Sequence, residues 1–219
     1  PKTSEATDVQ AVDGSWTLVD PGDLMGLKDS PWKGVAYGGD KFVAVANNSG
    51  GIMMYSSDGN TWTAGSTAAN NSQAVTYDAG KFVAVGTSPV GMYSEDGITW
   101  TQMDTSLSQA RDVCYGGGKF VAVAESNLGG DNDYAYSSDG INWTVGSITG
   151  GTRWNCITYG NGRYVALNAN NSQRAAYSDD LVTWTMANTP SNGNFQSVAY
   201  GNGKFVAVAA NGGKIMYSS

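Results

Sequence analysis

The sequence contains no histidine and only two cysteines, Cys114 and Cys156. Without histidine, the chain cannot form a Ser-His-Asp or Cys-His catalytic arrangement or a histidine-based zinc site. Two thiols do not make a disulfide scaffold. The cysteines lie in neighbouring repeats, at positions that differ by two residues when the repeats are aligned. This offset favours two buried free thiols over a disulfide bond. No pattern for a cofactor or a metal site is present, and we expect neither.

Charged residues are scarce, and long apolar runs are missing. Charged side chains make up 14% of the chain, and 12 basic residues against 19 acidic ones give a net charge of −7. The basic residues form no cluster, so nucleic acid is not an expected partner. No apolar run approaches the length of about 18 residues that a membrane-spanning helix needs. Many glycines and aromatic residues instead indicate short strands joined by tight turns.

Five copies of one phrase follow one another about 40 residues apart. Each copy holds a "VAY"-type, a "KFVAV"-type and a "YS"-ending segment, and four copies continue to "WT". Glycine with Asn or Asp separates the first two segments and permits the positive φ of tight hairpins. The second segment is apolar at successive positions, which is typical of a strand buried on both faces. The tyrosines of the first segment are Tyr37, Tyr77, Tyr115, Tyr159 and Tyr200.

This repeat predicts an all-β fold, a five-bladed β-propeller of four-stranded antiparallel blades. The fifth copy lacks its fourth strand, whereas "SWTLV" at 15–19 supplies a spare one before the first copy. We therefore expect the N-terminal strand to complete the last blade and close the ring, which removes a free edge. We expect 1–12 to be a flexible N-terminal segment and 13–219 to be a single domain. Because the chain begins at Pro1, it is expected to be processed or part of a longer protein.

The turn before each "WT" carries a family resemblance. It reads "SSDGNTW" (56–62), "SEDGITW" (94–100), "SSDGINW" (137–143) and "SDDLVTW" (178–184). These turns resemble the Asp-box of sialidase-like propellers, one residue shorter between Asp and Trp. The whole unit resembles repeats of bacterial surface proteins and phage tail or fibre proteins, a likeness that implies a fold more than an activity. Because Leu181 replaces glycine, the fourth turn is expected to differ from the others.

The Asp and Gly of these turns have a structural explanation. The carboxylate can accept backbone N–H groups, and the glycine can adopt positive φ. We therefore expect a structural role, away from any active site, for Asp58, Gly59, Asp96, Gly97, Asp139 and Gly140.

Catalytic residues are hard to find. A sialidase-like site needs three arginines, a tyrosine nucleophile and an acid, and only the arginines have candidates. Arg163 occupies a position where the sister repeats carry lysine, whereas Arg111, Arg153 and Arg174 could share one face. A carboxylate pair for glycoside hydrolysis would have to come from Asp112, Glu125, Asp131 and Asp133. The "DND" at 131–133 has calcium-like chemistry but no EF-hand frame, which favours a solvated loop. We expect no enzyme.

The variable connections indicate a binding site. Those before the first strand and after the second emerge on the same face of a blade, and they are rich in Asn, Ser, Thr and Gly. One repeat position at this face is polar in all five copies: Lys33, Gln73, Arg111, Asn155 and Gln196. Beside it stand Trp32, Trp154 and Phe195. Aromatic rings next to amides suit sugars. The alternative is that the aromatics fill gaps between blades.

Two function classes remain open. The first is a non-catalytic binding or adhesion module that recognises glycans or a cell-surface receptor through this face. The second is a structural or protein-interaction domain of a phage tail, a fibre or a secreted assembly. Both imply an extracellular, cell-surface or virion-associated protein. Both are also compatible with a place in a larger multidomain or oligomeric assembly.

Overall fold

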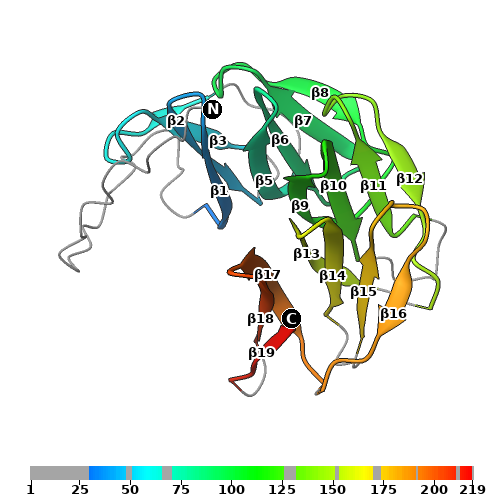
Figure 1. The fold of residues 1–219 in the computed structure, drawn as a ribbon. Helices are drawn as coiled ribbons and strands as arrows, with labels where there is room; N and C mark the ends of the chain where they lie inside the picture. The colour runs from blue at the N-terminus through cyan, green and yellow to red at the C-terminus, as the bar shows by residue number, and fades with distance from the viewer. Residues whose placement is uncertain are drawn as a thin grey trace, which may run out of the picture.

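The computed structural model describes residues 30–47, 51–65, 71–125, 132–150, 153–169, 174–190, 192–210 and 213–218. Within these ranges all regular structure is β-strand, so no helix there could cross a membrane. The strands form five sheets that follow one another in an arc (Figure 1). The protein is an all-β, five-bladed propeller, as the repeat predicted.

Each blade is one sheet whose strands follow the order of the chain, and every pair is antiparallel. Blade 1 contains β1 (Trp32–Gly38), β2 (Lys41–Ala46), β3 (Met53–Ser56) and β4 (Thr63–Ala64). Blade 2 contains β5 (Ser72–Asp78), β6 (Lys81–Gly86), β7 (Val90–Ser94) and β8 (Thr101–Asp104). Blade 3 contains β9 (Ala110–Gly116), β10 (Lys119–Ala124), β11 (Tyr134–Ser137) and β12 (Thr144–Gly146). Blade 4 contains β13 (Trp154–Gly160), β14 (Arg163–Asn168), β15 (Ala175–Ser178) and β16 (Thr185–Ala187).

Blade 5 contains β17 (Phe195–Gly201), β18 (Lys204–Ala209) and β19 (Ile215–Ser218), three strands within the described ranges. The segment expected to supply its fourth strand, 15–19, and the N-terminal segment 1–12 both lie outside the described residues. Closure by the N-terminal strand therefore stays a prediction.

The core lies between successive blades. In β6 and β10 the residues after the initial lysine are buried on both faces, as their unbroken apolar sequence predicted. Side chains of one blade pack on the next: Val83 and Val85 share a cluster with Phe120, and Val43 and Val45 share one with Phe82. Burying each such side chain contributes about 1.5–3 kcal/mol. The repeat therefore stabilises the stack of blades rather than any single sheet.

The aspartate of each turn organises its backbone as expected. Oδ1 of Asp139 accepts the backbone N–H groups of Ile141 and Asn142, each at 2.8 Å, and the hydroxyl of Ser137. Gly140 has φ 73°. The hydrogen bonds from Asn142 and Ile141 hold the pKa of the Asp139 carboxyl well below its usual range. The same backbone bonds, from Thr61 and Asn60, lower the pKa of Asp58 to about 2.

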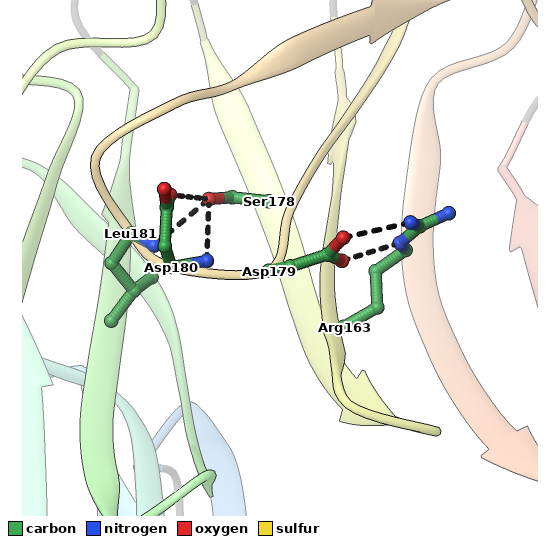
Figure 2. A network of polar contacts seen from close by, with 5 residues as sticks. All are labelled: Arg163, Ser178, Asp179, Asp180 and Leu181. Carbon is green, nitrogen blue, oxygen red and sulfur yellow. Dashed lines mark hydrogen bonds and ion pairs between the residues drawn. The ribbon is translucent and has the colours of Figure 1, made fainter.

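The fourth turn was expected to differ, and this expectation was wrong. Leu181 adopts φ 62°, the conformation that glycine has in the other turns. Its N–H donates to Ser178 Oγ at 2.9 Å (Figure 2). Asp180 Oδ1 accepts the N–H of Val182 at 2.8 Å. The Leu181 side chain is buried among residues of blades 3 and 4. That burial compensates for a backbone conformation that costs a non-glycine residue about 1–2 kcal/mol.

Asp139→Ala is expected to lower Tm by about 2–6 °C, because the turn loses the acceptor of two backbone N–H groups. A depressed carboxyl pKa contributes stability that is present above the unfolded value near 3.9 and is lost as pH falls through the folded value. The difference from wild type should therefore shrink below about pH 4. Ser138→Ala, on the exposed neighbour, is the control. Equal melting of both variants would show that the carboxylate does not hold the turn.

Candidate functional site

The innermost strands of the five blades share one irregularity. Pairing in blade 1 passes from Trp32↔Ala46 directly to Gly34↔Val45, so Lys33 is an extra residue in a β-bulge. The other four blades have the same register shift at the equivalent position. The bulged residues are Lys33, Gln73, Arg111, Asn155 and Gln196, which we call the bulge ring. The sequence grouped these five residues, and the structure gives each the same backbone position.

Hydrogen bonds on both sides hold each bulge in place. Beyond the bulge, the ladder continues with Thr87 N–H to Asn71 O at 3.1 Å in blade 2 and Glu125 N–H to Gln109 O at 3.0 Å in blade 3. Blade 4 repeats it with Ala169 N–H to Arg153 O at 3.0 Å. A bulge redirects a side chain out of the pleat, and such features gather at sheet ends and next to active sites. The bulge ring lies where the innermost strands begin, and we call this side of the propeller the loop face.

The bulge ring presents polar groups of mixed exposure. Lys33 and Gln196 are exposed, whereas Gln73, Arg111 and Asn155 are half-buried. The Asn155 amide donates to Phe195 O at 2.7 Å and so joins blades 4 and 5. Gln73 Nε2 is buried and has no hydrogen-bond partner among the described residues. The ring is therefore partly tied into the scaffold and partly available at the surface.

A charge cluster crosses from blade 3 to blade 4 on the loop face. The Arg111 guanidinium forms a hydrogen-bonded ion pair with Glu125, and Arg153 Nε lies 3.6 Å from the other oxygen of Glu125. Arg153 has φ 63° and a side chain that is 44% exposed. Two cations share one carboxylate, so the cluster carries a net positive charge. The sequence placed Arg111 and Arg153 as arginines that could share one face and named Glu125 only as a candidate carboxylate for catalysis. It did not predict that Glu125, which follows β10, pairs with both arginines.

The aromatic side chains beside the bulge ring are differently placed. Trp154 is 0% exposed and Phe195 is 1% exposed, whereas Trp32 is half-buried. Trp154 packs in the cluster between blades 3 and 4, and Phe195 packs in the cluster between blades 4 and 5. In the described structure, neither ring offers a face on which a sugar could stack. For these two residues, the packing between blades matches the gap-filling alternative.

Asp112 follows the bulge in β9 and is a structural carboxylate. Its Oδ1 accepts the Val113 N–H, and its Oδ2 accepts the Ile157 N–H of blade 4, each at 2.9 Å. Burial raises its pKa to about 6. Cys114 and Cys156 are free, as expected. Burial, with the charge of Asp112 as a smaller cause, raises the pKa of both thiols far above the usual range, which makes them poor nucleophiles.

The expectation of a solvated loop at 131–133 was wrong for Asp133. This residue is 4% exposed, and its Oδ2 accepts the Ile148 N–H at 2.8 Å. Burial raises its pKa. Asp131 lies outside the described residues. Within the described ranges, no three His, Cys, Asp or Glu side chains are grouped so that they could hold a metal ion.

Comparison of the coordinates with solved structures finds other propellers. A chain of a nidogen/laminin complex matches with a TM-score of 0.68 and 12% identity, over 86% of this chain and 75% of that one. YCF48 bound to D1 peptide matches with a TM-score of 0.63 and 18% identity, over 87% and 63%. YCF48 from Cyanidioschyzon merolae matches with a TM-score of 0.56 and 13% identity, over 86% and 71%. At these identities the likeness shows the fold.

No family model and no curated protein matches the sequence. The resemblance to surface, tail and fibre repeats therefore stays a prediction. Function is therefore inferred from the residues of the loop face.

Proposed function

We propose that this propeller is a non-catalytic binding module that docks a protein or peptide segment on its loop face. The observation that carries the proposal is the bulge ring, because five blades place one polar side chain each at the same bulged position. Rigid display of variable polar groups on a repeated scaffold is typical of recognition surfaces. Two similar structures, a nidogen/laminin complex and YCF48 bound to D1 peptide, support a protein ligand without identifying one.

The charge cluster defines the chemistry of the ligand. Arg111 and Arg153 share the single carboxylate of Glu125, so a carboxylate of the ligand can neutralise the remaining cation. Asn155 and Gln196 add amide groups at the bulged positions of blades 4 and 5. The ligand is therefore a segment with an acidic side chain or a C-terminal carboxylate. A glycan is less favoured, because Trp154 and Phe195 offer no stacking face.

The absence of histidine and of a full catalytic set in the sequence supports a module without enzymatic activity. Under this proposal the protein works outside the cell or on a virion, through the surface it presents to a partner. A structural domain of an assembly would use the same surface. The binding module and the structural domain therefore differ in whether the contact with the partner is permanent.

Panning the immobilised protein against a random-peptide display library, with a glycan array in parallel, tests the proposal. We expect enrichment of acidic peptides whose affinity falls about tenfold in Arg153→Ala, because loss of one charge-assisted contact costs about 1.4 kcal/mol. Lys119→Ala, at the start of β10 on the opposite side, is the matched control and should bind as wild type does. Binding on the glycan array alone would show that the ligand is a glycan and not a peptide. An equal loss of peptide affinity in Arg153→Ala and Lys119→Ala would show that the site is not on the loop face.

A further inference from the structure

The charge cluster between blades 3 and 4 is not required by the repeated fold. In every blade, the residue that follows the second strand donates its N–H to the carbonyl of the residue that precedes the first strand. From blade 1 to blade 5, the donors are Asn47, Thr87, Glu125, Ala169 and Ala210, and the acceptors are Pro31, Asn71, Gln109, Arg153 and Asn194. Glu125 and Arg153 are the only charged residues in these two sets. The fold therefore accepts neutral side chains at both positions, and the charges need another explanation.

Glu125 lies between two arginines and uses its two oxygens differently. Oε2 forms the hydrogen-bonded ion pair with Arg111, whereas Oε1 lies 3.6 Å from Arg153 Nε. The second distance is longer than a hydrogen bond, so this ion pair leaves the N–H groups of Arg153 unused. The Arg153 side chain is 44% exposed, compared with 29% for Arg111 and 20% for Glu125. An acidic group that approaches from solvent therefore meets Arg153 with Glu125 close behind it.

The Glu125 carboxylate determines how strongly the cluster attracts anions of different charge. Two arginines alone would present two positive charges, and a doubly charged anion would gain twice the attraction of a singly charged one. Glu125 cancels one positive charge and repels each unit of negative charge on the ligand. A phosphoryl group carries about −1.5 to −2 charge at pH 7, so it is repelled more than a carboxylate and costs more to desolvate. The cluster therefore fits a single carboxylate.

The nearby Asp112 carboxylate is bound to backbone groups. Asp112 follows Arg111 in β9, and its oxygens accept the N–H groups of Val113 and Ile157. Burial is the largest cause of its raised pKa, and the two backbone hydrogen bonds oppose it. Among the described residues, Asp112 forms no ion pair with Arg111 or Arg153. Glu125 is therefore the carboxylate that balances the two arginines.

We propose that Glu125 sets the charge selectivity of the loop face, so that the docked segment is bound through a carboxylate and not through a phosphorylated residue. This inference rests on the proposed function, because it names the acidic group that the docked segment carries. Arg153 makes the contact with that group, and Glu125 removes the advantage that a doubly charged group would have.

Two short peptides with blocked ends test the selectivity: acetyl-Gly-Asp-Gly-amide and the same peptide with phosphoserine in place of Asp. Titration at about pH 7.5, where phosphoserine is mostly doubly charged, is followed by NMR of the arginine Nε–H groups. Wild type should bind the two peptides with affinities within about threefold of each other. Glu125→Gln should strengthen binding of the Asp peptide about fivefold and of the phosphoserine peptide about twenty-five-fold, because the repulsion it removes acts on each unit of ligand charge.

Two further variants control for folding and for total charge. Glu95→Gln makes the same chemical change on the opposite side of the propeller, where Glu95 Oε1 lies 3.6 Å from Lys81 Nζ, and it should bind both peptides as wild type does. Arg111→Gln removes a positive charge and should act in the opposite direction. It should weaken binding of the Asp peptide about fivefold and of the phosphoserine peptide about twenty-five-fold, which keeps the test open if Glu125→Gln does not fold.

The outcomes separate this inference from the proposed function. If the Asp peptide binds through Arg153 but Glu125→Gln strengthens both peptides equally, the selectivity is wrong and the docking site stands. A wild-type protein that prefers phosphoserine at least about fivefold would also overturn the selectivity. If neither peptide shifts the Arg153 signal in wild type or in Glu125→Gln, both the selectivity and the docking site are contradicted.

Discussion

Trp154→Ala is expected to lower the free energy of unfolding by about 3–5 kcal/mol, the cost of removing a large buried aromatic side chain. Trp154 is 0% exposed and packs with Val123, Tyr134 and Ile157 between blades 3 and 4. The loss is a large part of the stability of a typical domain of about 5–15 kcal/mol. Denaturant unfolding followed by far-UV circular dichroism measures it.

Two variants separate packing from ligand contact at this position. Trp154→Phe should retain most of the stability, because blade 5 carries Phe195 at the equivalent buried position and Trp154 Nε1 has no hydrogen-bond partner among the described residues. Trp32→Ala removes the half-buried equivalent in blade 1 and should cost less than Trp154→Ala. A Trp154→Ala protein that melts like wild type and has lost only peptide or sugar binding would return Trp154 to the ligand site.

The repeat made the strands and their order predictable, because residue type and spacing determine both. The bulge ring was visible as five polar residues, but the bulge itself was not. A bulge is a shift in hydrogen-bond register, and Lys33 and Asn155 carry no residue-type signal for it. The burial of Trp154 was equally hidden, since it depends on the neighbouring blade and not on the loop that precedes it.

Individual blades carry residues that do not fit the repeat, and packing against other parts of the chain stabilises them. The local sequence does not show this packing. Leu181 looked incompatible with the glycine conformation of its turn, yet contacts with blade 3 hold it there. Asp133 looked like part of a solvated loop, yet it accepts the Ile148 N–H in a buried position. Contacts across long sequence separations decided both cases, and a local pattern does not contain them.

A pocket between blades 4 and 5 gives a structural reason to expect that residues 15–19 add the missing strand. It has a volume of about 430 Å3, and its lining includes Leu167 and Tyr177 of blade 4 and Phe205 and Met216 of blade 5. In the inner blades, the tryptophan that precedes the fourth strand packs at this type of seam. The ring centroid of Trp184 lies 5.2 Å from that of Tyr134 of blade 3, and Trp143 Nε1 of blade 3 donates to Met103 Sδ of blade 2 at 3.2 Å. Trp16 is the tryptophan left for blade 5.

Deletion of residues 1–20 should therefore destabilise the protein by at least about 3–5 kcal/mol, the cost of losing one buried tryptophan. It also exposes β19 as a sheet edge, which favours aggregation. A synthetic peptide of residues 1–20 should restore Tm to the truncated protein, and the same peptide with Trp16→Ala should not. A truncated protein that melts where the full chain does would contradict the added strand.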